Sequence, residues 1–194
     1  MRIGVLGGTF DPIHFAHLLL AEQAREQLVL DKVLLMPAGD PWRKAGRDIA
    51  PAAVRLEMVR RAAGGNPYLE VDDRELRREG ATYTVDTLRE LRAELEEDDD
   101  LFLLLGEDAL VDLPNWKDPA KLAQHATIAV APRQGAAEPD SLPFDPAGVQ
   151  RIDMPYMAIS ATDLRQRVRL GQSLRYMVPE AVREFIEANG LYLE

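Results

Sequence analysis

The chain has 194 residues, of which 46% are hydrophobic and 29% are charged, and its formal net charge is −10. This length and composition predict one globular domain with a substantial core, and the acidic balance disfavours nucleic-acid binding, which needs clustered positive surface. The chain contains no cysteine, which excludes disulfides and thiolate metal sites, and no apolar run approaches the roughly 18 residues of a membrane span, so we expect a cytoplasmic protein without a membrane segment.

The chain opens on a predicted buried strand, residues 2–6 (RIGVL), followed by Gly7 and Gly8 and by a predicted helix over about 14–28. Glycines at the end of a parallel strand let the backbone approach a ligand closely, and the N-terminus of the next helix favours negative charge. His14 and His17 are three residues apart and therefore share one face of the first helical turn, where imidazoles can donate to phosphate oxygens. This stretch predicts a phosphate site.

A metal site is the alternative interpretation of two imidazoles at this spacing. The third histidine, His125, lies far along the chain, and no H-E-x-x-H pattern is present. We therefore predict no metal site built from protein side chains.

Strands and helices alternate through the middle of the chain. Predicted strands cover residues 32–37, 68–71, 101–105, 127–131 and 149–153. Helices are expected from Pro51 to before Pro67, from within 82–88 onward, and over 118–124. In the first of these, Met58, Val59 and Ala62 should face inward, with Arg55 outside that face. The alternation predicts an α/β fold, a Rossmann-like doubly wound parallel sheet.

Several predicted strands end in residues that suit a nucleotide ligand. Lys44 lies in the loop after residues 32–37, Gly106 and Asp108 follow 101–105, and Arg133 follows 127–131. The carboxyl ends of parallel strands lie at one edge of a sheet, so the fold should gather these residues beside the opening phosphate site.

The last part of the chain, about 155–194, is predicted to be a small helical part of the same domain, 1–194. Ser160 and Asp163 form a capping-box pattern at a helix start. The hydroxyls of Ser160 and Thr162, the free N–H groups of that helix start and Arg165 one turn later together suit the β- and γ-phosphates of a triphosphate.

Two motifs resemble the nucleotidyltransferase superfamily that carries an H-x-G-H motif. Residues 7–17 (GGTFDPIHFAH) resemble its opening signature, with Ala16 at the position where the family usually has glycine. Residues 159–165 (ISATDLR) match its I-S-x-T-x-x-R segment, which binds the triphosphate.

Further motifs narrow the resemblance to the bacterial nicotinate-nucleotide adenylyltransferase family, over nearly the full length. Residues 82–88 (TYTVDTL) match T-Y-T-x-D-T-L, and residues 106–108 and 113–116 match G-x-D and L-x-x-W. Residues 37–44 follow P-x-G-x-P-x-x-K, although Trp42-Arg43 replaces the commoner Pro-His pair.

The resemblance implies transfer of AMP from ATP to nicotinate mononucleotide, by direct in-line attack without a covalent enzyme intermediate. The products are nicotinate adenine dinucleotide and pyrophosphate, in NAD biosynthesis. It implies Mg²⁺ held mainly by the ATP phosphates, and His14, His17 and Arg165 as catalytic residues. Thr84 would help to bind the nicotinate carboxylate, and Trp116 would stack on the pyridine ring. The implied substrate-binding residues are Gly7, Gly8, Thr9, Phe10, Lys44, Thr84, Gly106, Asp108, Trp116, Arg133, Ser160 and Thr162.

Three other functions fit parts of the sequence. A related enzyme such as the phosphopantetheine adenylyltransferase would share residues 7–17 but not 82–88 or 106–116. A nucleotide-sensing protein would be expected to lack a histidine of the first motif or Arg165. A fragment of a class I aminoacyl-tRNA synthetase would need a tRNA-binding surface, which the acidic balance disfavours. The sequence leaves open the choice between nicotinate and nicotinamide mononucleotide and the oligomeric state, a homo-oligomer included.

Overall fold

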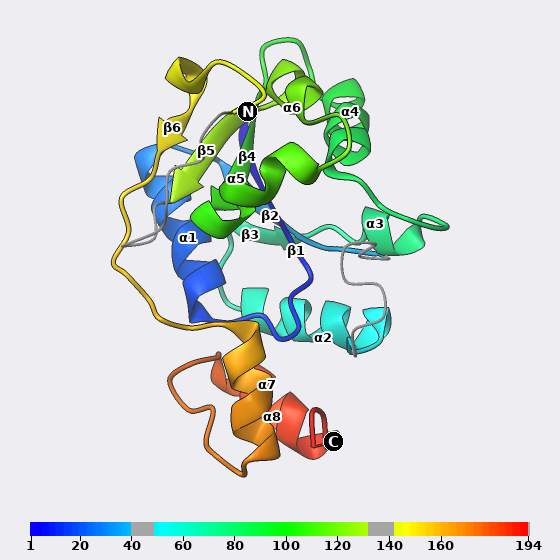
Figure 1. The fold of residues 1–194 in the computed structure, drawn as a ribbon, viewed down its shortest axis with the longest axis vertical. Coiled ribbons are helices and arrows are strands. Elements are labelled where there is room, and N and C mark those ends of the chain that lie inside the picture. Colours follow the sequence, from blue (N-terminus) through cyan, green and yellow to red (C-terminus); the bar gives the residue numbers. More distant parts are fainter. Residues whose placement is uncertain (40–48, 132–141, 194) are drawn as a thin grey trace.

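The computed structural model describes residues 1–39, 49–131 and 142–193. Its centre is a six-stranded parallel sheet with the strand order β3-β2-β1-β4-β5-β6 (Figure 1). The strands are β1 (Arg2–Gly8), β2 (Lys32–Pro37), β3 (Leu69–Val71), β4 (Asp100–Gly106), β5 (Thr127–Ala131) and β6 (Gln150–Arg151).

The helices connect these strands and extend beyond them. They are α1 (Phe15–Gln27), α2 (Ala52–Ala63), α3 (Arg74–Arg77), α4 (Thr84–Glu94), α5 (Glu107–Asp112), α6 (Pro119–His125), α7 (Ala161–Arg169) and α8 (Glu180–Ala188). Short 3₁₀ turns cover η2 (Leu113–Asn115) and η3 (Pro146–Gly148). After β3 the chain returns to pair β4 with β1, so the strand order reverses between β1 and β4. Open α/β sheets bind ligands at this reversal, beyond the carboxyl ends of the strands.

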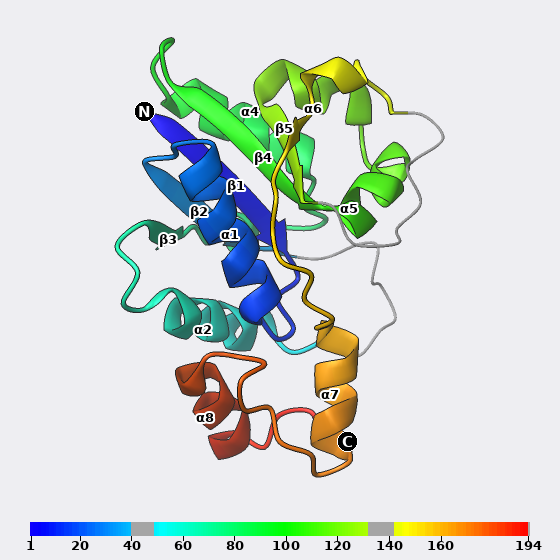
Figure 2. The ribbon, with the colours of Figure 1, turned by 90° about the vertical axis from the view of Figure 1, so that its left-hand side faces the viewer.

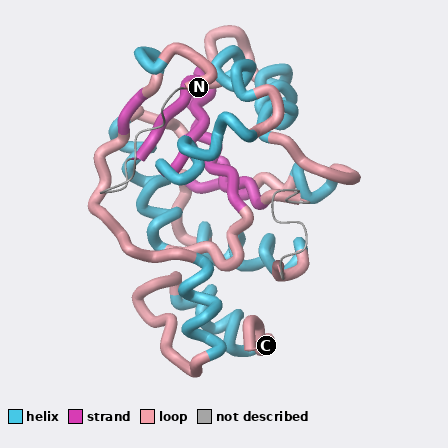
Figure 3. The backbone as a smooth tube through the Cα atoms, viewed as in Figure 1, coloured by secondary structure: helices cyan, strands magenta, loops and turns pink. Residues whose placement is uncertain are grey.

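Helices cover both faces of the sheet (Figure 2). One apolar cluster joins Leu6 of β1 to α1, α2, α7 and α8, and the other joins Ile3 and Val5 of β1 to α4, α5 and α6. Successive side chains of a strand point to opposite faces, which is why β1 contributes to both clusters. In Figure 3 the C-terminal helices lie beyond the carboxyl ends of the central strands, and Figure 2 shows α2 between α8 and the sheet.

The predicted parallel sheet is confirmed, and β2 and β5 have the predicted bounds. The last strand is shorter than predicted, since only Gln150–Arg151 pairs with β5. Two helices were not predicted: α3, with four residues, and α5, with six. Each is too short to show a helical period of apolar residues. No helix in the described part of the chain is long and apolar enough to cross a membrane.

Candidate active site

A pocket of about 370 Å³ lies at the carboxyl ends of β1, β2 and β4, where the strand order reverses. The main chain of Gly7, Gly8 and Thr9 forms one side, and Thr84 and Trp116 line it from α4 and from the segment after η2. A Cβ at Gly8 would lie 2.9 Å from the Phe10 ring, so a larger residue there would have to displace this buried ring. Residues 7–9, Thr84 and Trp116 therefore line one pocket, whereas Gly106 and Asp108, which were predicted to gather beside the phosphate turn, are not among the residues that line it.

His14 and His17 stack beside this strand end. His14 immediately precedes α1 and His17 lies in its first turn, and their ring centroids are 3.7 Å apart. The Phe10 ring, itself only 2% exposed, meets the His17 ring edge-on at 5.1 Å. The His14 backbone N–H donates to His17 Nδ1 at 3.2 Å, which leaves the proton of a neutral His17 ring on Nε2.

His14 is a buried, neutral imidazole. Its side chain is 5% exposed, and its Nδ1 atom is buried without a hydrogen-bond partner in the described part of the chain. Burial lowers the pKa of His14 from 6.5 to about 4, so the ring is uncharged at neutral pH. A buried polar atom without a partner costs free energy, and a ligand at this position would offset that cost.

The burial of His14 predicts a loss of stability in mild acid. Because its pKa is lower in the folded state, the unfolded chain binds the extra proton between pH 6.5 and 4. A contribution of roughly 3 kcal/mol is therefore complete above pH 6.5 and is lost as the pH falls towards 4. Urea unfolding at pH 7, 5.5 and 4.5 measures this loss, and His14→Gln should reduce it. An identical pH dependence in wild type and His14→Gln would contradict the assignment.

Arg165 reaches the opening turn from the C-terminal part of the chain. Its Nη1 donates to the Asp11 carbonyl oxygen at 2.7 Å and lies 3.8 Å from the Asp11 carboxylate. Ser160 caps α7 by accepting from the Asp163 N–H at 3.1 Å, and the Thr162 side chain is exposed. Tertiary packing thus brings the two motifs together, although they lie at opposite ends of the chain.

The buried Asp11 carboxylate, 2% exposed, also holds the C-terminal segment. The Tyr192 hydroxyl donates to Asp11 Oδ1 at 2.7 Å, and the Ala50 N–H donates to the same carboxylate at 3.3 Å. Burial raises the pKa of Tyr192 above its usual value, so this hydroxyl stays protonated and remains a donor. Neither Asp11 nor Tyr192 was predicted as a site residue, because only the tertiary fold places them together.

The remaining predicted site residues are less enclosed or lie outside the described residues. Gly106 ends β4, and a Cβ there would meet no heavy atom within 4 Å, while Asp108 is exposed. The Trp116 ring is half-buried and its Nε1 donates to Asp112 Oδ2 at 3.3 Å. Lys44 and Arg133 lie outside the described residues.

Arg55 corrects one sequence prediction. It was expected outside the inward face of its helix, but it is 2% exposed, and burial lowers the pKa of its guanidinium. Arg55 lies three and four residues before Met58 and Val59, both of which are fully buried. This helical spacing places it on the same face, and the spacing is the signal that could have identified it.

Glu75 is a second buried charge that sequence analysis missed. It is 8% exposed and lines the pocket from α3, and burial raises the pKa of its carboxyl. The Thr87 hydroxyl donates to Glu75 Oε1 at 2.8 Å. In the sequence Glu75 belongs to a charged connection, in which nothing distinguishes it from the other charged residues.

Comparison with known proteins assigns the family. Residues 5–167 match the family described as Cytidylyltransferase-like. A Roseiflexus protein named "Probable nicotinate-nucleotide adenylyltransferase" is 46% identical over 195 residues, which cover 98% of this chain and 97% of the relative. A Dehalococcoides mccartyi protein of the same name is 41% identical, covering 99% and 97%. The chain belongs to the nicotinate-nucleotide adenylyltransferase family.

Structural comparison supports the same fold for this nicotinate-nucleotide adenylyltransferase family member. The Plasmodium falciparum nicotinic acid mononucleotide adenylyltransferase complexed with NaAD superposes with a TM-score of 0.80. The two chains are 17% identical, and the match covers 98% of this chain and 97% of the other. The Rossmann-like fold and the family resemblance predicted from the sequence are both confirmed.

Proposed function

We propose that this chain transfers the AMP moiety of ATP to nicotinate mononucleotide, forming nicotinate adenine dinucleotide and pyrophosphate in NAD biosynthesis. The observation that carries the proposal is one shared pocket. Gly7, Gly8 and Thr9 of the phosphate turn line the same cavity as Thr84 and Trp116. Two nucleotides bound on the two sides would have their phosphates side by side at the end of β1.

Each predicted site residue has a role in this proposal. ATP lies along Gly7, Gly8, Thr9 and the backbone of Phe10, with its phosphates on His14, His17 and Arg165. The Trp116 ring stacks on the pyridine, and Thr84 at the start of α4 helps to bind the carboxylate. The other predicted contacts are the β- and γ-phosphates on Ser160 and Thr162, the nucleoside near Gly106 and Asp108, phosphate between the two substrates on Lys44, and phosphate or carboxylate on Arg133.

The reaction needs no general base, because the phosphate of the acceptor is already an anionic nucleophile. One of its oxygens attacks the α-phosphorus of ATP in line, and the bond to the pyrophosphate oxygen breaks. Catalysis is then positioning together with stabilisation of charge that grows on the α-phosphate and the leaving group. His14 contributes as a neutral donor, and Arg165 as a cation fixed against Asp11.

Mg²⁺ is proposed as the cofactor and as part of the bound ATP. The side chains beside the phosphate turn are two imidazoles, a guanidinium and the Asp11 carboxylate, which already accepts from Tyr192 and Ala50. Mg²⁺ prefers oxygen ligands, keeps several waters and commonly binds through substrate phosphates. In residues 1–39, 49–131 and 142–193, no group of three or more His, Asp or Glu side chains could hold a metal. Mg²⁺ would supply charge neutralisation at the triphosphate, and we assign it no protein ligand.

The whole chain, 1–194, is proposed to act as one domain, because α7 and α8 share an apolar cluster with β1, α1 and α2. We propose no nucleic-acid or membrane partner. The cytoplasmic location and a homo-oligomeric state remain predictions, which cell fractionation and light scattering would test.

The function is tested with a panel of acceptors. Pyrophosphate release from ATP is measured with nicotinate mononucleotide, nicotinamide mononucleotide and phosphopantetheine. We expect the highest kcat/KM with nicotinate mononucleotide, and the ratio to nicotinamide mononucleotide measures the preference that the sequence leaves open. Turnover of phosphopantetheine alone, or of no acceptor, would show that the proposal is wrong.

Trp116→Ala should weaken acceptor binding. Stacking of a base on an aromatic ring contributes roughly 1–3 kcal/mol, so the KM for nicotinate mononucleotide should rise by about tenfold or more. The KM for ATP should stay within about twofold, and Trp116→Phe should retain most of the affinity because it keeps an aromatic face. An unchanged KM for the acceptor in Trp116→Ala would reject the stacking.

A further inference from the structure

We infer that Arg55 is a positioning residue for adenylyl transfer, holding the phosphate turn at a set distance from the acceptor pocket. The inference rests on the proposed function. Arg55 belongs to α2, is only 2% exposed, and is not among the residues that line the pocket. Its contribution is therefore made through the backbone that it binds.

The guanidinium joins three separate segments of main chain. Arg55 Nη1 donates to the Thr9 carbonyl oxygen at 2.8 Å, Nη2 to that of Gly39 at 3.1 Å and Nε to that of Ala50 at 3.0 Å. Thr9 belongs to the phosphate turn after β1, and Gly39 follows β2. A planar guanidinium presents its donors in a rigid fork, so it can fix the spacing of several carbonyls at once.

The Gly39 contact continues into the acceptor side of the pocket. Gly39 packs so closely against α3 that a Cβ on it would lie 2.1 Å from the Glu75 carbonyl oxygen. Its backbone N–H and the Thr82 hydroxyl favour the charged Glu75 carboxylate, to which the Thr87 hydroxyl of α4 also donates. Gly39 is thus held by Arg55 on one side and by Glu75 on the other.

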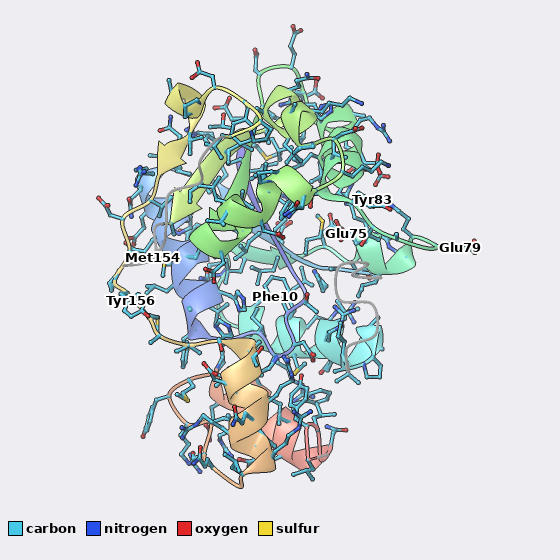
Figure 4. All side chains as sticks on the ribbon, in the orientation of Figure 1. Phe10, Glu75, Glu79, Tyr83, Met154 and Tyr156 are labelled. Atoms are coloured by element: carbon cyan, nitrogen blue, oxygen red, sulfur yellow. The ribbon has the colours of Figure 1, made fainter. Side chains whose placement is uncertain are left out.

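Figure 4 labels the side chains at the two ends of this connection. Glu75 and Tyr83 both line the pocket, at α3 and immediately before α4, and Phe10 follows Thr9 in the phosphate turn. The connection therefore runs from the ATP side, through Thr9, Arg55 and Gly39, to Glu75 on the acceptor side. Displacing it would change the distance between the two substrates without removing any group that touches them.

Arg55→Lys tests the inference, with Val59→Ala as a matched control. A lysine keeps the positive charge but cannot bind three carbonyls in one plane. Val59 lies in the same helix and is 0% exposed, so its truncation removes core packing. It is not among the residues that line the pocket. The measurements are thermal unfolding, kcat and both KM values well below the melting temperature, and hydrogen exchange of peptides containing Thr9 and Gly39.

We expect Arg55→Lys to lower kcat by about tenfold to a hundredfold, the scale for misplacing reacting groups, with both KM values within about threefold. Exchange should rise around Thr9 and Gly39. Val59→Ala should lower the melting temperature with kcat within about twofold. Equal kcat losses in the two variants, or wild-type kcat and exchange in Arg55→Lys, would overturn the inference.

Gly39→Ala keeps the inference testable if Arg55→Lys does not fold. The added Cβ must move Gly39 away from Glu75 and so disturb the Arg55 contact, and the same fall in kcat with little change in KM is expected. Wild-type kcat in Gly39→Ala would contradict the inference. A wild-type protein that adenylylates no acceptor would instead refute the proposed function, while the exchange measurements would still test the connection.

Discussion

Replacing His14 with alanine is expected to lower kcat by about a hundredfold or more, the scale of losing one donor that stabilises transition-state charge. The buried ring is neutral at pH 7 because burial lowers the pKa of His14 to about 4. The ring would therefore stabilise the transition state through a directed hydrogen bond and not through a formal charge. The fold should survive, because the substitution also removes a buried Nδ1 atom that has no partner in the described residues.

His125→Ala is the matched control for His14→Ala. His125 ends α6 just before β5 begins, at the edge of the sheet opposite the strand ends that line the pocket. The His125→Ala variant should therefore keep kcat within about twofold of wild type. His14→Asn retains an N–H donor and should lose less activity than His14→Ala. An active His14→Ala enzyme, or equal losses in His14→Ala and His125→Ala, would contradict a catalytic role for His14.

Arg165→Lys is expected to lower kcat/KM for ATP by about a hundredfold, because a lysine is a point charge and cannot reproduce the bidentate fork of arginine on phosphate oxygens. Arg165 Nη1 already donates to the Asp11 carbonyl oxygen at 2.7 Å, and this hydrogen bond fixes the orientation of the guanidinium. A single lysine ammonium at this position could not bind the Asp11 carbonyl oxygen and two phosphate oxygens in the same planar geometry.

Arg167→Lys controls for the loss of a guanidinium from the same helix. Arg167 donates from Nε and Nη2 to the Ser173 carbonyl oxygen at 3.1 Å, within the C-terminal part of the chain. We expect kcat/KM for ATP within about twofold of wild type in this variant, and similar melting temperatures for both variants. A similar kcat/KM in the two variants would remove Arg165 from the phosphate site.

The sequence predicted the central elements of the fold well. Residues 32–37 and 127–131 are strands with the expected bounds because each is a short run of buried apolar residues between clear breaks. The short helices α3 and α5 were not predicted. Helices of so few residues are stabilised mainly by tertiary contacts, which leave no periodic pattern in the sequence.

The sequence placed His14 and His17 on one face of a helical turn, and in the structure their rings stack. The contact of Arg165 with Asp11 was not predicted. The buried charges of Arg55 and Glu75 could not be assigned roles, because their partners are backbone atoms and hydroxyls of other segments. Sequence patterns record side-chain types, and they carry no information on which carbonyl a guanidinium will meet.

The sequence by itself determined the family and the parallel sheet and predicted which residues bind phosphate, because these inferences depend on local apolar periodicity and on contiguous motifs. Only the tertiary structure decided which carbonyl oxygens Arg55 binds, that Asp11 joins Arg165 to Tyr192, and that one pocket joins residues 7–9 to Thr84 and Trp116. The physical reason is that a buried charge must find hydrogen-bond partners wherever the folded chain supplies them, and those partners are distant in sequence.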